Sequence, residues 1–283
     1  MGDGPAAGRA EPEPPAAAGT AQPEAAPGPA QPSAAAGGAQ SPAGARPAFY
    51  AAGPGRWRDW WTLLHPPYTA WNLSNVVIGA VLAPRTSLTP LLATLGAFFL
   101  AVGVGAHALD EVHGRPLRTR IPGPVLVAVT VIGLAGALAL GAAGIARVGW
   151  VLLPFMIVGP VLVVAYNAEL LGGIIHTTAG MAVAWGAFPV LTAYVAQTGR
   201  LALAPVLAAA GVTALAVAQR RLSTPARTLR RRSVRVEGSV TMADGQVAAV
   251  DQPSLLAPLE GALSAMSWGM MLLAAALAVA RLT

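Results

Sequence analysis

Hydrophobic residues form seven runs between residues 69 and 280, and short polar or charged stretches separate them. Most of the runs approach the roughly 20 residues that a helix needs to cross a bilayer. The seven predicted spans are Thr69–Ala83, Leu88–Leu109, Pro124–Ile145, Val148–Tyr166, Thr178–Ala196, Leu201–Ala218 and Ala257–Ala280. The first is short, and we expect the aromatic stretch before it, typical of a membrane interface, to extend it. We therefore predict an all-α, polytopic transmembrane helical bundle of about seven spans in residues 49–283.

The first 48 residues have a different character. They are rich in Ala, Pro, Gly and Gln, and they show no apolar periodicity. Such a segment cannot bury a core, so we predict a disordered tail at residues 1–48. It also lacks the compact apolar run of a signal peptide.

The overall composition agrees with a membrane protein. Of the 283 residues, 55% are hydrophobic and only 11% are charged, which is unlike a soluble domain. The absence of cysteine excludes disulfides and thiolate chemistry. The net charge of +6 comes from arginines between the apolar runs, which indicates membrane topology rather than nucleic-acid binding. The abundance of Ala, Gly and Arg without any Lys is typical of a GC-rich genome, and we expect a bacterial cytoplasmic membrane.

The arginines also predict an orientation. With the N-terminus inside, fourteen of the eighteen arginines lie on the inner side. The four on the outer side are Arg85, Arg147, Arg200 and Arg281. Because cytoplasmic loops carry the excess of basic residues, we predict an inside N-terminus. The largest inner segment is a basic cytoplasmic loop at residues 219–256, in which Val234–Gln246 is predicted to form a small hairpin.

Ionisable residues are concentrated at the inner end of the second span. Asp110 and Glu111 end the apolar run, and Arg115 and Arg118 follow a few residues later. Ionisable groups at membrane depth are costly and usually mark a site. Mg²⁺ binds through one or two carboxylates plus substrate phosphates, and arginines bind phosphate oxygens bidentately. The cluster is a candidate Mg²⁺ and diphosphate site; the alternatives are a salt bridge within it and arginines that only set the topology.

Two further polar stretches lie on the predicted inner side. Asn167, Glu169 and His176 are close to glycines, which fits a cavity lining, with Glu169 or His176 as a base. The alternative is a loop that only caps its helices. The basic run Arg220–Arg235 also has two interpretations, because it would bind anionic lipid headgroups or a diphosphate directly.

Residues 103–122 resemble the first aspartate motif of the UbiA-type intramembrane prenyltransferases. Asp110 matches one acid of that motif, and Arg115-Pro116-Leu117 matches the Arg-Pro-Leu that follows it. Glu169–Gly199 is similar to the fifth-span region of naphthoate prenyltransferases, which opens with Glu-Leu and closes with Tyr-x-x-Gln-Thr-Gly. Asn72–Gly79 is similar to the family's first span. The chain departs from the family after the sixth span, where a basic run replaces the second acidic motif.

The resemblance implies an enzyme that acts on a polyprenyl diphosphate, by prenyl transfer to an acceptor or by terpene cyclisation. The residues implied as catalytic are Asp110, Glu111, Glu169 and His176, with Mg²⁺ on the first two. The residues implied to bind the substrate are Asn75, His107, Arg115, Arg118, Tyr166 and Asn167. A second hypothesis is a non-catalytic membrane protein that binds a lipid or isoprenoid, or serves as a subunit. A third is a small transporter.

Overall fold

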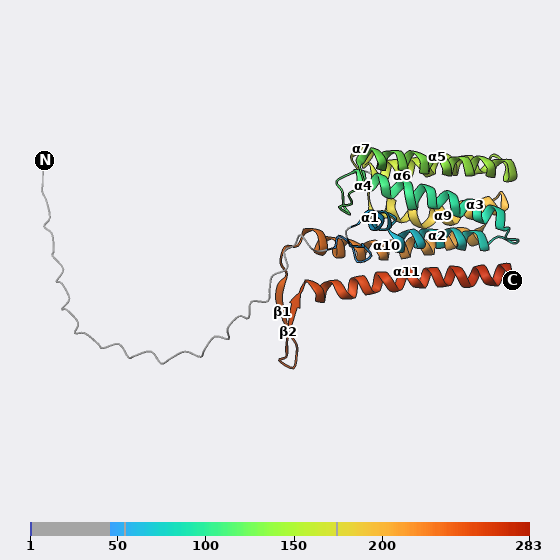
Figure 1. Cartoon of the computed structure of the whole chain (residues 1–283). Helices are drawn as coiled ribbons and strands as arrows, with labels where there is room; N and C mark the ends of the chain where they lie inside the picture. The colour runs from blue at the N-terminus through green and yellow to red at the C-terminus, as the bar shows by residue number, and fades with distance from the viewer. Residues whose placement is uncertain (2–45, 54, 174) are drawn as a thin grey trace. The chain divides into compact units, whose positions relative to one another are not determined.

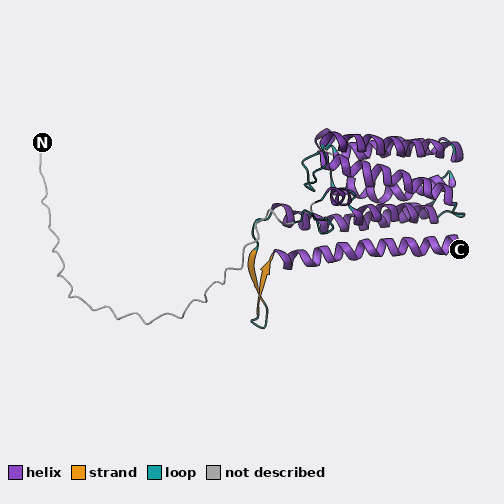
Figure 2. Ribbon diagram, viewed as in Figure 1, coloured by secondary structure: helices purple, strands orange, loops and turns teal. Residues whose placement is uncertain are grey.

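A computed structural model describes Met1 and residues 46–53, 55–173 and 175–283. This part of the chain is predominantly helical, and its strands form one short hairpin (Figures 1 and 2). The predicted all-α polytopic bundle is therefore confirmed. Residues 2–45 of the predicted disordered tail lie outside the described residues.

The helices and strands follow in chain order. The first half contains α1 (Arg56–Leu63), α2 (Pro66–Val81), α3 (Leu88–Phe98), the π-helix η2 (Phe99–Ala106), α4 (His107–Val112) and α5 (Gly123–Val148). A 3₁₀ turn η3 (Trp150–Leu152), α6 (Leu153–Asn167), α7 (Leu170–Gly173), α8 (Thr178–Ala182), the π-helix η4 (Val183–Ala187) and α9 (Phe188–Thr198) come next. The chain ends with α10 (Leu203–Arg232), β1 (Glu237–Thr241), β2 (Val247–Asp251) and α11 (Gln252–Leu282).

Six helical segments of the described chain are long and apolar enough to cross a membrane. They correspond to six of the seven predicted spans. The remaining one is α2, whose 16 residues give a helix about 24 Å long, shorter than the roughly 30 Å hydrocarbon core. Ten of its residues are buried, because α9 and α11 pack along it. The first predicted span is thus a short helix inside the bundle.

The predicted basic loop at residues 219–256 is wrong in extent. Helix α10 continues through Gln219 and ends at Arg232, so most of the basic run is helical. The predicted hairpin is confirmed, but its second strand reaches Asp251, with Glu237 opposite Asp251 and Thr241 opposite Val247. Helix α11 begins directly after it, because the Asp251 carboxylate and the Ser254 hydroxyl form a capping box. Helices α4, α6 and α10 finish at one end of the bundle, and α5 and α11 begin there (Figure 1). We call this end of the bundle the "basic end".

The centre of the bundle is the contact of α2 with η4 and α9. Pro189 stands four residues after Trp185 and has no N–H, so the Trp185 carbonyl lacks its usual helical donor. The side-chain amides of Asn72 and Asn75 donate to this oxygen instead, at 3.2 and 3.0 Å. Unsatisfied backbone groups are costly away from water, so these contacts hold the helices in register.

A second close contact lies one turn further along α2. Gly79 approaches α9 so closely that an added Cβ would lie 2.1 Å from the carbonyl oxygen of Val190. The neighbouring atoms belong to the backbone, so no side chain can move aside to make room. Only glycine fits at this position.

We expect Gly79→Ala to lower the stability of the folded protein by about 1–3 kcal/mol, the usual cost of overpacking a core. The matched control is Gly211→Ala in α10, because a Cβ there meets no atom within 4 Å. The measurement is the thermal unfolding temperature of both variants in detergent. Equal unfolding temperatures would contradict the α2–α9 contact.

Candidate functional site

A polar cavity of about 580 Å³ opens at the basic end. Its walls come from the segment Pro47–Tyr50, from α2, α4, α10 and α11, and from the connection between α6 and α8. Its ionisable lining residues are Tyr50, His65, Tyr68, His107, Asp110, His113, Tyr166, Glu169, His176, Arg220, Arg227, Arg230, Arg231, Arg232 and Glu260. Segments far apart in the sequence therefore share one chamber.

The structure brings together most of the predicted site residues. Those that line the cavity are His107, Asp110, Tyr166, Asn167, Glu169 and His176. The end of the second predicted span and the connection after the fourth thus line the same cavity. Four other predicted residues are not among the lining residues: Asn75, Glu111, Arg115 and Arg118. Asn75 instead supports the bundle through the Trp185 carbonyl.

Glu111 organises the loop that follows α4. Its side chain is fully buried, and its carboxylate accepts hydrogen bonds from the backbone N–H groups of Leu117 and Thr119 and from the Thr119 hydroxyl, at 2.8–2.9 Å. These contacts occupy both carboxylate oxygens. The prediction that Glu111 holds Mg²⁺ beside Asp110 does not agree with this geometry.

The arginines of the same loop also serve the loop itself. Arg115 donates to the carbonyl oxygens of Ile121, at 2.5 Å, and Thr119, at 3.4 Å. Arg118 is exposed. Both residues have positive φ, 51° and 55°, which is uncommon for residues other than glycine, and Gly114 directly before Arg115 has φ 80°. The prediction that Arg115 and Arg118 hold the diphosphate is therefore not supported by their positions.

The arginines that line the cavity come from the end of α10. Arg220, Thr224, Arg227 and Arg231 are spaced at i, i+4, i+7 and i+11, which places them on one face of the helix. The sequence analysis predicted a loop for this run, so it did not predict that these side chains point into one cavity. The helical spacing of these residues is the signal that would have identified it.

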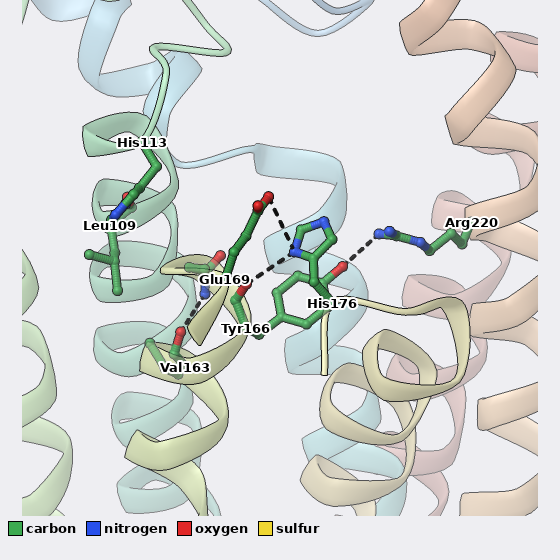
Figure 3. Close-up of polar contacts among 8 residues, drawn as sticks. Leu109, His113, Val163, Tyr166, Glu169, His176 and Arg220 are labelled. Atoms are coloured by element: carbon green, nitrogen blue, oxygen red, sulfur yellow. Dashed lines mark hydrogen bonds and ion pairs between the residues drawn. The ribbon is translucent and has the colours of Figure 1, made fainter. Parts of the chain in front are cut away.

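Arg220 is fixed in place by Tyr166. One guanidinium nitrogen donates to the Tyr166 hydroxyl at 2.6 Å, and the guanidinium carbon lies 5.9 Å from the ring centroid (Figure 3). On the other side, the His176 ring stacks on Tyr166 with centroids 4.5 Å apart. His176 Nδ1 is 3.0 Å from the Tyr166 carbonyl oxygen and 3.9 Å from the Glu169 carboxylate. Tyr166 thus joins the two predicted bases to the basic face of α10.

The segment Pro47–Tyr50 covers another part of the cavity. The Tyr50 hydroxyl lies 2.7 Å from His65 Nδ1, and the His65 ring stacks on His107 at 4.2 Å. Burial, followed by the neighbouring His107, holds the pKa of His65 well below its usual value. Burial and the nearby Tyr68 raise the pKa of Tyr50 well above its usual value. A protonated Tyr50 therefore donates to a neutral His65.

Three buried side chains of the cavity wall keep a polar atom without a partner among the described residues. These atoms are His65 Nε2, Asn72 Oδ1 and Gln219 Oε1. Buried polar groups are nearly always hydrogen-bonded, and exceptions indicate a missing ligand or water. The inner part of the cavity is therefore suited to a polar ligand.

An apolar groove of about 200 Å³ adjoins the polar cavity. Residues of α3, α5, α6 and α9 line it, and among them are Ala97, Ala137, Gly141, Met156 and Phe188. Val102 and Trp185 belong to the walls of both spaces. The site therefore combines a cationic chamber with an adjacent hydrocarbon groove.

The residues of the cavity do not fit a resident magnesium ion. Within the described chain, no group of three or more His, Cys, Asp or Glu side chains is placed to hold a metal. Glu260 pairs with Arg230, and Glu169 lies beside His176, while Glu111 is outside the cavity lining and binds its own loop. Among the described acidic residues that line the cavity, Asp110 remains, and Arg227 and Arg231 line the same cavity. The donor set favours an anion over a cation.

No family model, curated protein or solved structure matches this chain. The class that the fold defines is a polytopic helical membrane protein with a basic polar cavity at one end of its bundle. The resemblance to the UbiA-type prenyltransferases remains a prediction from sequence.

We expect Glu111→Gln to lower the unfolding temperature and to speed trypsin cleavage after Arg118, because a neutral amide replaces a carboxylate that accepts three hydrogen bonds. The expected cost is about 1–3 kcal/mol. Glu169→Gln is the matched control, since its side chain is 67% exposed. Unchanged stability together with weakened Mg²⁺ binding would restore the original prediction for Glu111.

Acidification is expected to destabilise the protein through His65. Its folded pKa is lowered, so the neutral ring contributes stability above the unfolded value of about 6.5 and loses it as the pH falls below that value. The loss is at most about 1.4 kcal/mol per pH unit. Unfolding temperatures between pH 8 and pH 5 should fall less steeply in His65→Gln than in the wild type, whereas the exposed His113→Gln should follow the wild type.

Proposed function

We propose that this protein is an integral membrane enzyme that acts on a polyprenyl diphosphate. The observation that carries the proposal is that the basic cavity and the apolar groove have Val102 and Trp185 in common as wall residues. An amphiphile with an anionic head and a long hydrocarbon tail fits these two adjoining spaces. A soluble anion would need no groove, and a neutral lipid would need no cluster of arginines.

The same geometry supports a chemical role. In the proposed reaction the bond between the allylic carbon and the diphosphate oxygen breaks, and its electron pair leaves with the diphosphate. The guanidinium groups of α10 stabilise the charge that develops on this leaving group. The allylic cation is captured by an external nucleophile or by an internal double bond. Asp110, across the cavity from these guanidiniums, accepts the proton that is lost.

We also propose that the basic end lies on the cytoplasmic side of a bacterial membrane. Arg115, Arg118 and Arg120 and the arginines of α10 are at this end, whereas Arg147 and Arg281 are at the other. Cytoplasmic ends carry the excess of arginine, so this distribution supports an inside N-terminus.

A second candidate function is non-catalytic binding of the same kind of ligand. It is favoured by the small number of carboxylates that line the cavity, since one of the three, Glu260, is engaged in an ion pair with Arg230. Such a protein would hold an isoprenoid diphosphate or a related lipid without cleaving it. Binding and turnover distinguish the two functions.

The purified protein is expected to release diphosphate from farnesyl or geranylgeranyl diphosphate. The released diphosphate is measured by phosphate assay, and the products are identified by mass spectrometry. Asp110→Asn should keep the binding affinity within about threefold and should lose most of the turnover, since removing a general base costs about 10²–10⁴-fold. Ala137→Phe, which fills the groove, should weaken binding of geranylgeranyl diphosphate much more than binding of dimethylallyl diphosphate.

The matched control for the groove is Ala139→Phe, two residues further along α5, at an exposed position that does not line the groove. It should bind both substrates as the wild type does. Binding without diphosphate release in the wild type would favour the non-catalytic function. No binding of any chain length would rule out both functions.

A further inference from the structure

We infer that the arginine face of α10, defined as Arg220, Arg227 and Arg231, binds the diphosphate directly and takes the place of a divalent metal ion. This inference rests on the proposed function and specifies how the head of the ligand is held. It explains why the cavity lacks the acids that a metal would need. It also assigns a role to the basic run that follows the sixth predicted span.

The charge balance of the cavity supports direct binding. Five arginines and three carboxylates line it. Arg230 and Glu260 form an ion pair, in which one of the two contacts is 2.7 Å long. Four lining arginines and two lining carboxylates, those of Asp110 and Glu169, then remain. The chamber therefore keeps a positive excess that a diphosphate would neutralise.

Two of the three arginines are held by neutral groups. Arg220 donates one N–H to the Tyr166 hydroxyl, and Arg231 donates its Nε–H to the carbonyl oxygen of Pro47 at 3.2 Å. A guanidinium has five N–H donors, so each of these side chains keeps several for a ligand. Their positions are set before the ligand binds, and their charge is not cancelled.

Arg227 lies between them on the same face of α10. It forms no ion pair with a carboxylate of the described chain. Its side chain is half-buried, as are those of Arg220 and Arg231, which reduces screening by water. Planar guanidinium groups bind phosphate oxygens in pairs, and a diphosphate offers more such oxygens than a single phosphate.

Uncharged hydrogen-bond acceptors in the cavity wall also favour the arginine face as the position of the anion. The partnerless oxygens of Asn72 and Gln219 belong to the cavity wall, and Gln219 precedes Arg220 on α10. An anion would be repelled by these acceptors and drawn to the arginine face. The head of the ligand is therefore assigned to the arginine face of α10.

The test compares binding of farnesyl diphosphate, farnesyl monophosphate and farnesol to the full chain in nanodiscs, once with EDTA and once with Mg²⁺. Farnesyl diphosphate should bind with EDTA within about threefold of its affinity with Mg²⁺. Arg227→Gln and Arg231→Gln should each weaken its binding about ten- to hundredfold, the usual effect of losing charged hydrogen bonds. Binding of farnesol should not change in these variants.

Arg221→Gln is the matched control, because Arg221 is exposed on the same helix and does not line the cavity. It should bind farnesyl diphosphate within about twofold of the wild type. Arg227→Lys is a second control, which distinguishes loss of the charge from loss of the fold. It keeps the charge and should recover part of the affinity lost in Arg227→Gln.

The outcomes separate the two proposals. Binding that EDTA abolishes, with Arg227→Gln equal to Arg221→Gln, would overturn the arginine site and leave the proposed function in place. Absence of binding by any isoprenoid diphosphate in either buffer would overturn the proposed function itself. A preference for monophosphate over diphosphate would also contradict the three-arginine site.

Discussion

One backbone carbonyl, that of Trp185, determines how the centre of this bundle is assembled. Pro189 removes the donor that a regular helix would supply, and lipid or an apolar core offers no substitute. Asn72 and Asn75, three residues apart on one face of α2, provide it. This contact places the short helix α2 inside the bundle. It also fixes Trp185 between the basic cavity and the apolar groove.

The π-helical segments have a related consequence. The segments η2 and η4 each leave the regular helical pattern next to the site, and π-segments are frequently found at functional sites. The segment η2 runs directly into His107, and α5 supports it where the Thr130 hydroxyl donates to the carbonyl oxygen of Gly105 at 3.2 Å. In both segments a neighbouring helix supplies a side-chain donor to a backbone carbonyl, since α2 does the same for Trp185 in η4.

The charged side chains of the loop after α4 and those at the end of α10 make different kinds of contact. In the loop, Glu111 and Arg115 bind backbone groups and shape the chain. On α10, three arginines have no carboxylate partner in the described chain and face the cavity. The residue types are the same in both places, but their contacts are different. A basic cavity beside an apolar groove is the feature on which both proposals depend.

Much of the fold followed from the sequence, because long apolar runs predict helices by composition alone. Grouping Asp110 with Tyr166, Asn167, Glu169 and His176 succeeded because all of them stand at helix ends that the span order brings to one side. The roles of Glu111, Arg115 and Arg118 were not predictable in this way. Side chains in a loop point where the local φ angles direct them, and here two arginines adopt positive φ that glycine usually marks.

The amino-acid sequence by itself determined that this chain forms a membrane bundle with its ionisable residues gathered at the helix ends. Hydrophobicity and length suffice for that conclusion, because they are sums over residues and do not depend on orientation. The tertiary structure alone decided which of those residues face the same space. Each residue turns a helix by about 100°, so a helix that continues to Arg232 instead of ending near Ala218 carries its arginines into the cavity.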